Sequence, residues 1–353
     1  MIGEMLSLPK SIELVLFKKL GAKYCQTPED VMETLESTPE QNKLYLGTYF
    51  PRTFFEAYTT LYEINKIPII REMIRDKKNF YILDIGSGVG GYALGLIWAI
   101  NEIHGHKTIN LLSIDGDEEK LEIQKEIFNL LGMDVNISTL TKLFTSDDFQ
   151  DNLTELSKYK FDIVVASKFI VEIIRSQTKS PKRRLYQEFL STIENQIFEI
   201  GPSIVIINEI TEPITNGKKD YVPYSINRES HWYQKNPKSK LMCILPACCA
   251  LWHNECKDPG GCFSQKHLEI NHRGPYMNGE LFDDFNFFFK VFIRKTDGNK
   301  IIESLDKKKP PNCMKIFYNN CCRHGHNHNT DECDCTDDSP CVNAFSADIY
   351  MGD

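Results

Sequence analysis

The sequence lacks any long uninterrupted apolar segment. Its longest apolar run, residues 93–100, is far shorter than the roughly 18–20 residues that a membrane-spanning helix needs. The first residues also lack the pattern of a secretory signal or an acid-poor transit peptide, because Glu4 and Glu13 interrupt their apolar positions. We therefore expect a protein with no membrane partner that resides in the cytoplasm. The mitochondrial matrix is the alternative for a processed eukaryotic form.

The sequence also lacks an excess of positive charge. Its formal net charge is −8, so the chain as a whole does not attract phosphate backbones. Any contact with nucleic acid must then come from local basic patches. Two stretches qualify, residues 179–184 and 307–309, but for each of them a solvated loop is the favoured interpretation.

Cysteine is almost missing from the first two thirds of the chain. Of 12 cysteines, only Cys25 precedes Cys243. Because no export signal accompanies them, the clustered cysteines indicate metal binding rather than disulfides. Three regions are predicted: a helical N-terminal segment (1–75), a cofactor-binding α/β domain (76–240), and a Cys-rich segment with the strands that complete the sheet (241–353).

Hydrophobic periodicity predicts helices before residue 75. A helix start is expected at 27–30, where Pro28 and two acids follow Thr27, and residues 45–64 are expected to form a loop and then an amphipathic helix. After residue 80, short apolar runs alternate with helical patterns, which is typical of a parallel, doubly wound sheet. Strands are predicted at 81–85, 110–114, 135–139, 161–166 and 203–208, helices at 91–102, 118–131 and 184–199, and an edge strand at 285–293.

A glycine-rich loop follows the first predicted strand. Glycine lets the backbone turn sharply and approach a ligand closely. Gly86, Gly88 and Gly91 also satisfy the dinucleotide-binding pattern G-x-G-x-x-G. The acid Asp84, two residues before the first glycine, is typical of methyltransferases that use S-adenosylmethionine, so we expect a Rossmann-like class I methyltransferase fold. The residues predicted to bind the cofactor here are Asp84, Gly86, Ser87, Gly88 and Gly90.

The second strand ends in an acid, Asp115. A carboxylate at this place can accept hydrogen bonds from both ribose hydroxyls of an adenosine. The alternative is a helix N-cap, for which Asp115 or Asp117 would serve equally well before the acidic first turn at 118–119.

The fourth strand leads to a further candidate, because ligands of open α/β sheets bind beyond the carboxyl ends of the strands. Ser167 and Glu172 lie there, and Ser167 is predicted to contact the cofactor. No Asn/Asp-Pro-Pro-aromatic motif and no nucleophilic cysteine occurs in this loop, so no catalytic residue is predicted.

The cysteines of the C-terminal half are spaced for a metal centre. Cys249, Cys256 and Cys262 are separated by six and five residues, and Cys313, Cys321 or Cys322 could supply a fourth thiolate. Four thiolates suit tetrahedral zinc or a four-iron cluster. Because the C-x2-C pairs of a zinc ribbon are missing, we favour iron–sulfur; buried, inert thiols are the alternative. The tract 323–341 either holds a second metal or forms a polar tail.

Taken in order, several segments resemble the methyltransferase-like proteins of mitochondrial small-ribosomal-subunit assembly and their bacterial relatives. The resemblance spans roughly residues 45–353 and rests on 83–88, 162–167 with Glu172, 262–265, the aromatic strand around Phe287, Cys321 and the final Gly352 and Asp353. It implies a four-iron, four-sulfur cluster held by Cys249, Cys256, Cys262 and Cys321.

Two functions follow from these observations. One is an enzyme that methylates RNA, expected to be small-subunit ribosomal RNA or the assembling small subunit. The other is a non-catalytic binding module of the same fold that uses cofactor and cluster in ribosome assembly. The intact glycine loop favours the first, and the missing catalytic motif favours the second. The sequence does not specify the methylated atom or the oligomeric state.

Overall fold

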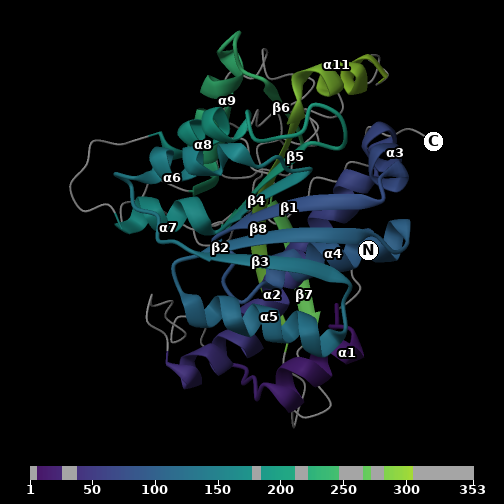
Figure 1. Cartoon of the computed structure of the whole chain (residues 1–353), viewed down its shortest axis with the longest axis vertical. Helices are drawn as coiled ribbons and strands as arrows, with labels where there is room; N and C mark the ends of the chain where they lie inside the picture. The colour runs from purple at the N-terminus through teal and green to yellow at the C-terminus, as the bar shows by residue number, and fades with distance from the viewer. Residues whose placement is uncertain are drawn as a thin grey trace, which may run out of the picture. The chain divides into compact units, whose positions relative to one another are not determined.

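A computed structural model describes residues 6–25, 38–176, 184–210, 222–245, 265–271 and 282–304. These residues belong to two compact units. The first unit comprises Met1–Tyr62, Arg75–Leu143 and Leu268–Phe285, and the second comprises Glu63–Ile74, Phe144–His267 and Asn286–Asp353. Figure 1 labels their helices and strands.

Three parallel strands form the sheet of the first unit. They are β1 (Asn79–Ile85), β2 (Thr108–Asp115) and β3 (Val135–Thr141), in the order β3-β2-β1. The register pairs Ile85 with Ile114, so the end of β1 lies beside the end of β2. Helices α4 (Gly91–His104) and α5 (Glu118–Leu131) follow the first two strands. The predicted alternation of strand and helix is confirmed here.

The first unit also contains the N-terminal helices. The short α1 (Lys10–Glu13) continues into a π-helical segment (Leu14–Lys19), and α2 extends over Pro39–Asn65. The start of α2 is a capping box: the N–H of Thr38 donates to Gln41 Oε1 at 2.8 Å, and the N–H of Gln41 donates to Thr38 Oγ1 at 3.3 Å. The helix start predicted at 27–30 lies outside the described residues.

The loop predicted at the beginning of 45–64 is wrong, because α2 runs through this stretch with Pro51 inside it. Gly47 lies within this helix and is needed for packing. A Cβ atom on it would lie 2.2 Å from the carbonyl oxygen of Lys23, so only glycine lets that segment approach the helix.

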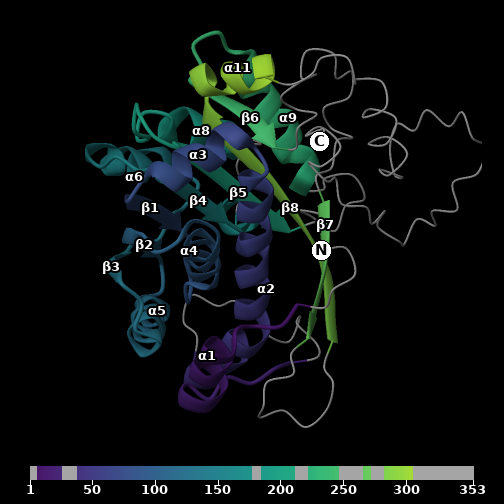
Figure 2. The same cartoon turned by 90° about the vertical axis from the view of Figure 1, so that its right-hand side faces the viewer.

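Helix α2 packs closely along α4, as Figure 2 shows. Two glycines of α4 make the approach possible. A Cβ on Gly91 would lie 2.2 Å from Thr53 Oγ1, and one on Gly95 would lie 2.1 Å from the carbonyl oxygen of Phe54. Gly91, a member of the dinucleotide-like pattern, therefore serves helix packing.

The second unit contains a mixed sheet of order β4-β5-β8-β6. Strand β4 (Ile163–Ser167) is parallel to β5 (Ile204–Ile210), whereas β8 (Phe282–Arg294) is antiparallel to β5 and to β6 (Leu241–Leu245). The strand predicted at 285–293 is thus confirmed as part of β8, but its predicted edge position is wrong, because β8 lies between β5 and β6. Strand β7 (Gln265–Asn271) also pairs with β8 but is not part of this strand order. The other α-helices among the described residues are α3 (Pro68–Asp76), α6 (Phe149–Glu155), α7 (Phe169–Ser176), α8 (Leu185–Ile193), α9 (Val222–Lys235) and α11 (Lys295–Ser304).

The helix predicted at 184–199 is shorter than expected. Helix α8 ends at Ile193 because the following residues bond to the start of β4. The N–H of Phe161 donates to the carbonyl of Gln196 at 2.9 Å, and Phe161 forms an isolated bridge with Ile197. Within the described ranges, no helix has the length and apolar character that a membrane crossing requires.

Candidate cofactor site

The glycine loop of the first unit turns tightly between β1 and α4. The N–H groups of Gly86 and Ser87 both donate to the carbonyl of Ile114, at 2.8 and 3.0 Å, which holds the loop against the end of β2. Gly86, Gly88 and Gly90 have φ values of 71°, 51° and 81°, a region that other residues adopt only with strain. The glycines are therefore required by the backbone path itself.

Asp115 holds the same loop from β2. Its Oδ2 accepts from the N–H of Gly88 at 2.8 Å, and its Oδ1 accepts from the N–H of Asp117 at 3.0 Å. Burial raises the pKa of Asp115, although these two hydrogen bonds oppose the shift. Each carboxylate oxygen has a second lone pair, so Asp115 can still accept from a ligand.

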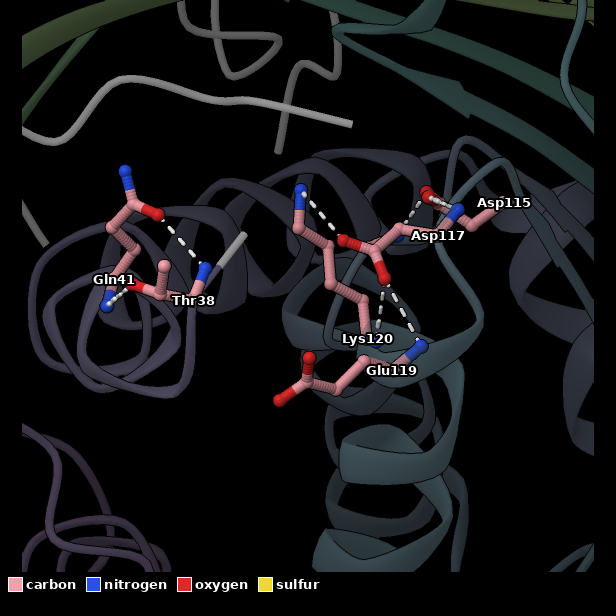
Figure 3. A network of polar contacts seen from close by, with 7 residues as sticks. Thr38, Gln41, Asp115, Asp117, Glu119 and Lys120 are labelled. Atoms are coloured by element: carbon pink, nitrogen blue, oxygen red, sulfur yellow. Dashed lines mark hydrogen bonds and ion pairs between the residues drawn. The ribbon is translucent and has the colours of Figure 1, made fainter. Parts of the chain in front are cut away.

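Helix α5 is capped by Asp117. Its Oδ1 accepts from the N–H groups of Glu119 at 3.0 Å and Lys120 at 3.3 Å, as Figure 3 shows. The sequence left open which of the two acids after β2 caps the helix. Asp117 is the N-cap, and the ribose contact of Asp115 stays a prediction.

Asp84 is fully buried near the end of β1. Within the described part of the chain, neither of its carboxylate oxygens has a hydrogen-bond partner. Burial, with a further contribution from the charge of Asp115, raises the pKa of Asp84 to about 7. An unsatisfied buried carboxyl group costs free energy. Asp84 therefore has free acceptor capacity beside the glycine loop.

A buried glutamine, Gln124 of α5, ties that helix to the loop. The Ser87 hydroxyl donates to Gln124 Oε1 at 3.4 Å, and Gln124 Nε2 donates to Ser113 Oγ at 2.9 Å. A Cβ on Gly90 would lie 2.4 Å from Gln124 Cγ. Gln124 was not predicted from the sequence; the available signal was a polar residue on the apolar face of the predicted helix 118–131.

Ser167, the other predicted cofactor contact, lies in the second unit at the end of β4. Its hydroxyl accepts from Asn208 Nδ2 at 3.0 Å, which joins the ends of β4 and β5. Lys168, the next residue, has a φ of 56°. Glu172 lies on the exposed side of α7. The role of Ser167 at the cofactor stays a prediction.

A second buried acid, Glu209 on β5, was also missed. Its Oε1 accepts from the N–H of Val171 at 3.2 Å and from the Tyr186 hydroxyl at 3.4 Å. Burial is the main cause that raises the pKa of Glu209 to about 8. An acid inside the apolar run 204–210 was the available signal. Because it caps the start of α7, we assign it a structural role.

The predicted metal ligands Cys249, Cys256, Cys262 and Cys321 all lie outside the described residues. The tract 323–341 lies outside them as well. The part of the chain that is described contains no cluster of three or more metal-ligating side chains. The metal site stays a prediction.

No family model and no curated protein matches the chain. Among solved structures, a proposed RNA methyltransferase from Pyrococcus horikoshii is 12% identical, with 81% of this chain and 99% of that one covered at a TM-score of 0.36. A precorrin-8w decarboxylase from Methanobacterium thermoautotrophicum is 15% identical over 64% and 87%, at 0.35. The precorrin-6y C5,15-methyltransferase from Geobacter metallireducens is 8% identical over 64% and 86%, at 0.34. At TM-scores this low, the similarities do not indicate a function for this chain. The residues of the candidate site are the basis of the function proposed below.

Proposed function

We propose that this chain has a class I methyltransferase fold, binds S-adenosylmethionine at the glycine loop of its first unit, and methylates RNA. The observation that carries the proposal is the pairing of a buried acid, Asp84, with a half-buried acid, Asp115, around one loop. Asp115 holds the N–H of Gly88, while Asp84 keeps both oxygens without a partner among the described residues. A loop shaped by three left-handed glycines and flanked by free acceptors fits an adenosyl cofactor.

The residues present suit two parts of this cofactor, its amino-acid end and its ribose. Asp84 would accept hydrogen bonds at the amino-acid end, where a positive charge would favour its ionised form. Gly86 and Gly88, without side chains, would let the backbone approach closely. Asp115 would accept from the ribose hydroxyls through its remaining lone pairs. When bound, the cofactor supplies an electrophilic methyl group.

The chain would contribute mainly positioning to the reaction. The described residues around the loop include no group that the geometry singles out as a general base, so alignment of the nucleophile would supply most of the rate. Ser167 is proposed to contact the cofactor from the end of β4. The family resemblance supports small-subunit ribosomal RNA, or the assembling small subunit, as the substrate.

Gly88→Arg tests the cofactor site, and Gly132→Arg is its matched control. Both glycines have positive φ values, 51° and 61°, so both variants carry similar backbone strain. A Cβ on Gly88 would approach the Tyr45 hydroxyl at 3.5 Å, whereas one on Gly132 would meet nothing within 4 Å. Calorimetry should show saturable binding of S-adenosylmethionine to the wild type and Gly132→Arg, and none to Gly88→Arg. Tighter binding of NAD than of S-adenosylmethionine would overturn the proposal.

An iron–sulfur cluster on Cys249, Cys256, Cys262 and Cys321 is proposed as a second cofactor. The spacing of the first three thiolates supports it, because ionised thiolates placed so close in the sequence would repel one another without a cation.

A further inference from the structure

A row of aromatic and cationic side chains begins at the glycine loop and follows α2. Lys120 Nζ lies 5.3 Å from the ring centroid of Tyr45. The rings of Tyr45 and Tyr49 are 5.3 Å apart with an angle of 33° between them. Arg52 Cζ then lies 5.6 Å from the Tyr49 ring and 5.3 Å from the Phe285 ring. We call these five residues the aromatic row; all belong to the first unit.

The aromatic row joins the candidate cofactor site at Gly88. The Tyr45 hydroxyl lies 3.5 Å from the place that a Cβ on Gly88 would occupy. Lys120 stands in the first turn of α5, one residue after Glu119, as Figure 3 shows. One acid faces this end of the row: Asp117 Oδ2 lies 3.9 Å from Lys120 Nζ. A ligand bound along the row would therefore reach the glycine loop.

The spacing of the row suits an unpaired nucleic-acid strand better than a single small ligand. Tyr45, Tyr49 and Arg52 occupy one side of α2 at helical spacing, about 10 Å from first to last. Single-stranded RNA is bound by aromatic side chains that stack with bases, next to cations that meet phosphates. Tyr45, Tyr49, Arg52 and Phe285 are each half-buried, so edges of the row remain accessible.

We infer that the aromatic row is the docking track for an unpaired segment of the RNA substrate and leads a nucleotide to the glycine loop. The inference rests on the proposed function and adds to it that the RNA is bound as an unpaired strand along α2. The net charge of −8 disfavours binding of phosphate elsewhere on the surface, and Arg52 supplies a local positive charge on this track; Lys120 is buried beside Asp117.

Tyr49→Ala tests the stacking step. The probe is a short fluorescein-labelled single-stranded RNA oligonucleotide, and binding is followed by fluorescence anisotropy at low salt. Tyr49→Ala should weaken binding by about tenfold, whereas Tyr49→Phe should keep it, because the ring is what stacks. Tyr62→Ala is the matched control, a tyrosine of the same helix outside the row that is 37% exposed. An equal loss in Tyr62→Ala, or a Tyr49→Ala variant that melts earlier but binds RNA normally, would overturn the inference.

Arg52→Gln tests the electrostatic step. Removing one phosphate contact should lower the slope of log affinity against log salt by about 0.7, and Arg52→Lys should restore the slope. A duplex of the same sequence should bind more weakly than the single strand, since its bases are already stacked. Equal or tighter duplex binding would contradict the track.

Two outcomes separate this inference from the proposed function. Wild-type protein that binds S-adenosylmethionine but no single-stranded RNA would overturn the track and leave the cofactor site standing. Protein that binds RNA in a Tyr49-dependent way but no S-adenosylmethionine would support the track and overturn the proposed function.

Discussion

At the scale of single residues, the three acids at the ends of β1 and β2 have different tasks. Asp117 caps a helix, Asp115 holds the glycine loop, and Asp84 has unused acceptors within the described structure. The three lie within or directly after strands β1 and β2. Their roles differ because burial and hydrogen-bond donors differ at each position, and substitutions can therefore separate them.

Asp84 should make the stability of the cofactor-free protein depend on pH. Its pKa is about 7 in the folded state, against 3.8 for an unperturbed aspartate, so the folded state binds more protons between these values. The contribution of Asp84 to stability then falls as pH rises from about 4 to about 7. Asp84→Asn removes this dependence. Between about pH 5 and about pH 8, the variant should gain about 2–3 kcal/mol of unfolding free energy relative to the wild type, measured by urea unfolding. A pH-independent difference would show that Asp84 is ionised throughout this range.

Replacing Asp115 or Asp117 by alanine should affect different properties, cofactor affinity for Asp115 and stability for Asp117. Asp115→Ala should weaken binding of S-adenosylmethionine by about 1–3 kcal/mol, because hydrogen-bond partners are left without an acceptor. Asp117→Ala should lower the unfolding free energy by about 0.5–2 kcal/mol through loss of the α5 cap, with cofactor affinity unchanged. Calorimetry and thermal melting measure the two effects. If Asp117→Ala weakened cofactor binding as much as Asp115→Ala, the division of roles would be wrong.

At the scale of elements, the packing of α2 along α4 positions the glycine loop. The contact depends on Gly91 and Gly95, whose missing side chains admit the backbone of α2. The same helix α2 carries Tyr45 toward Gly88. A change at the helix contact should therefore affect both stability and the site.

Gly95→Ala should destabilise the protein by about 1–3 kcal/mol, although alanine favours helices more than glycine does. The new Cβ would lie 2.1 Å from the carbonyl oxygen of Phe54, and backbone there cannot move without shifting α2. Gly298→Ala in α11 is the control. Its Cβ would lie 2.7 Å from Met242 Sδ, the end of a flexible side chain, so a smaller loss is expected. Urea unfolding of the two variants measures the difference, and equal losses would argue against a rigid contact between α2 and α4.

At the scale of the whole molecule, the predicted metal centre would join distant parts of the C-terminal region, because its ligands extend from Cys249 to Cys321. Anaerobically isolated protein should be brown and hold about four irons per chain, with visible absorption from thiolate-to-iron charge transfer. Cys256→Ser or Cys262→Ser should remove the colour and the iron while the glycine loop still binds cofactor. Cys25→Ser is the control, because Cys25 lies in the first unit and outside the predicted ligand set. Colourless protein with one tightly bound zinc would indicate a structural zinc site instead.

The sequence by itself determined the α/β alternation, the glycine loop and the acids at the ends of β1 and β2. These features depend on local properties: apolar periodicity, the left-handed backbone of glycine and the short distance from strand end to cap. Helix α5 illustrates this, since its predicted and observed bounds agree at Glu118–Leu131.

Only the tertiary structure decided which of these residues act together. Gly47 and Gly91 serve contacts with segments distant in the sequence. Gln124 reaches Ser87 across 37 residues, and Arg52 meets Phe285 through the chain's return along β8. The sequence identified Asp84 as a candidate cofactor-binding residue. It did not reveal that both carboxylate oxygens of Asp84 lack hydrogen-bond partners among the described residues. Burial and missing partners depend on everything packed around a side chain, and no local pattern contains that information.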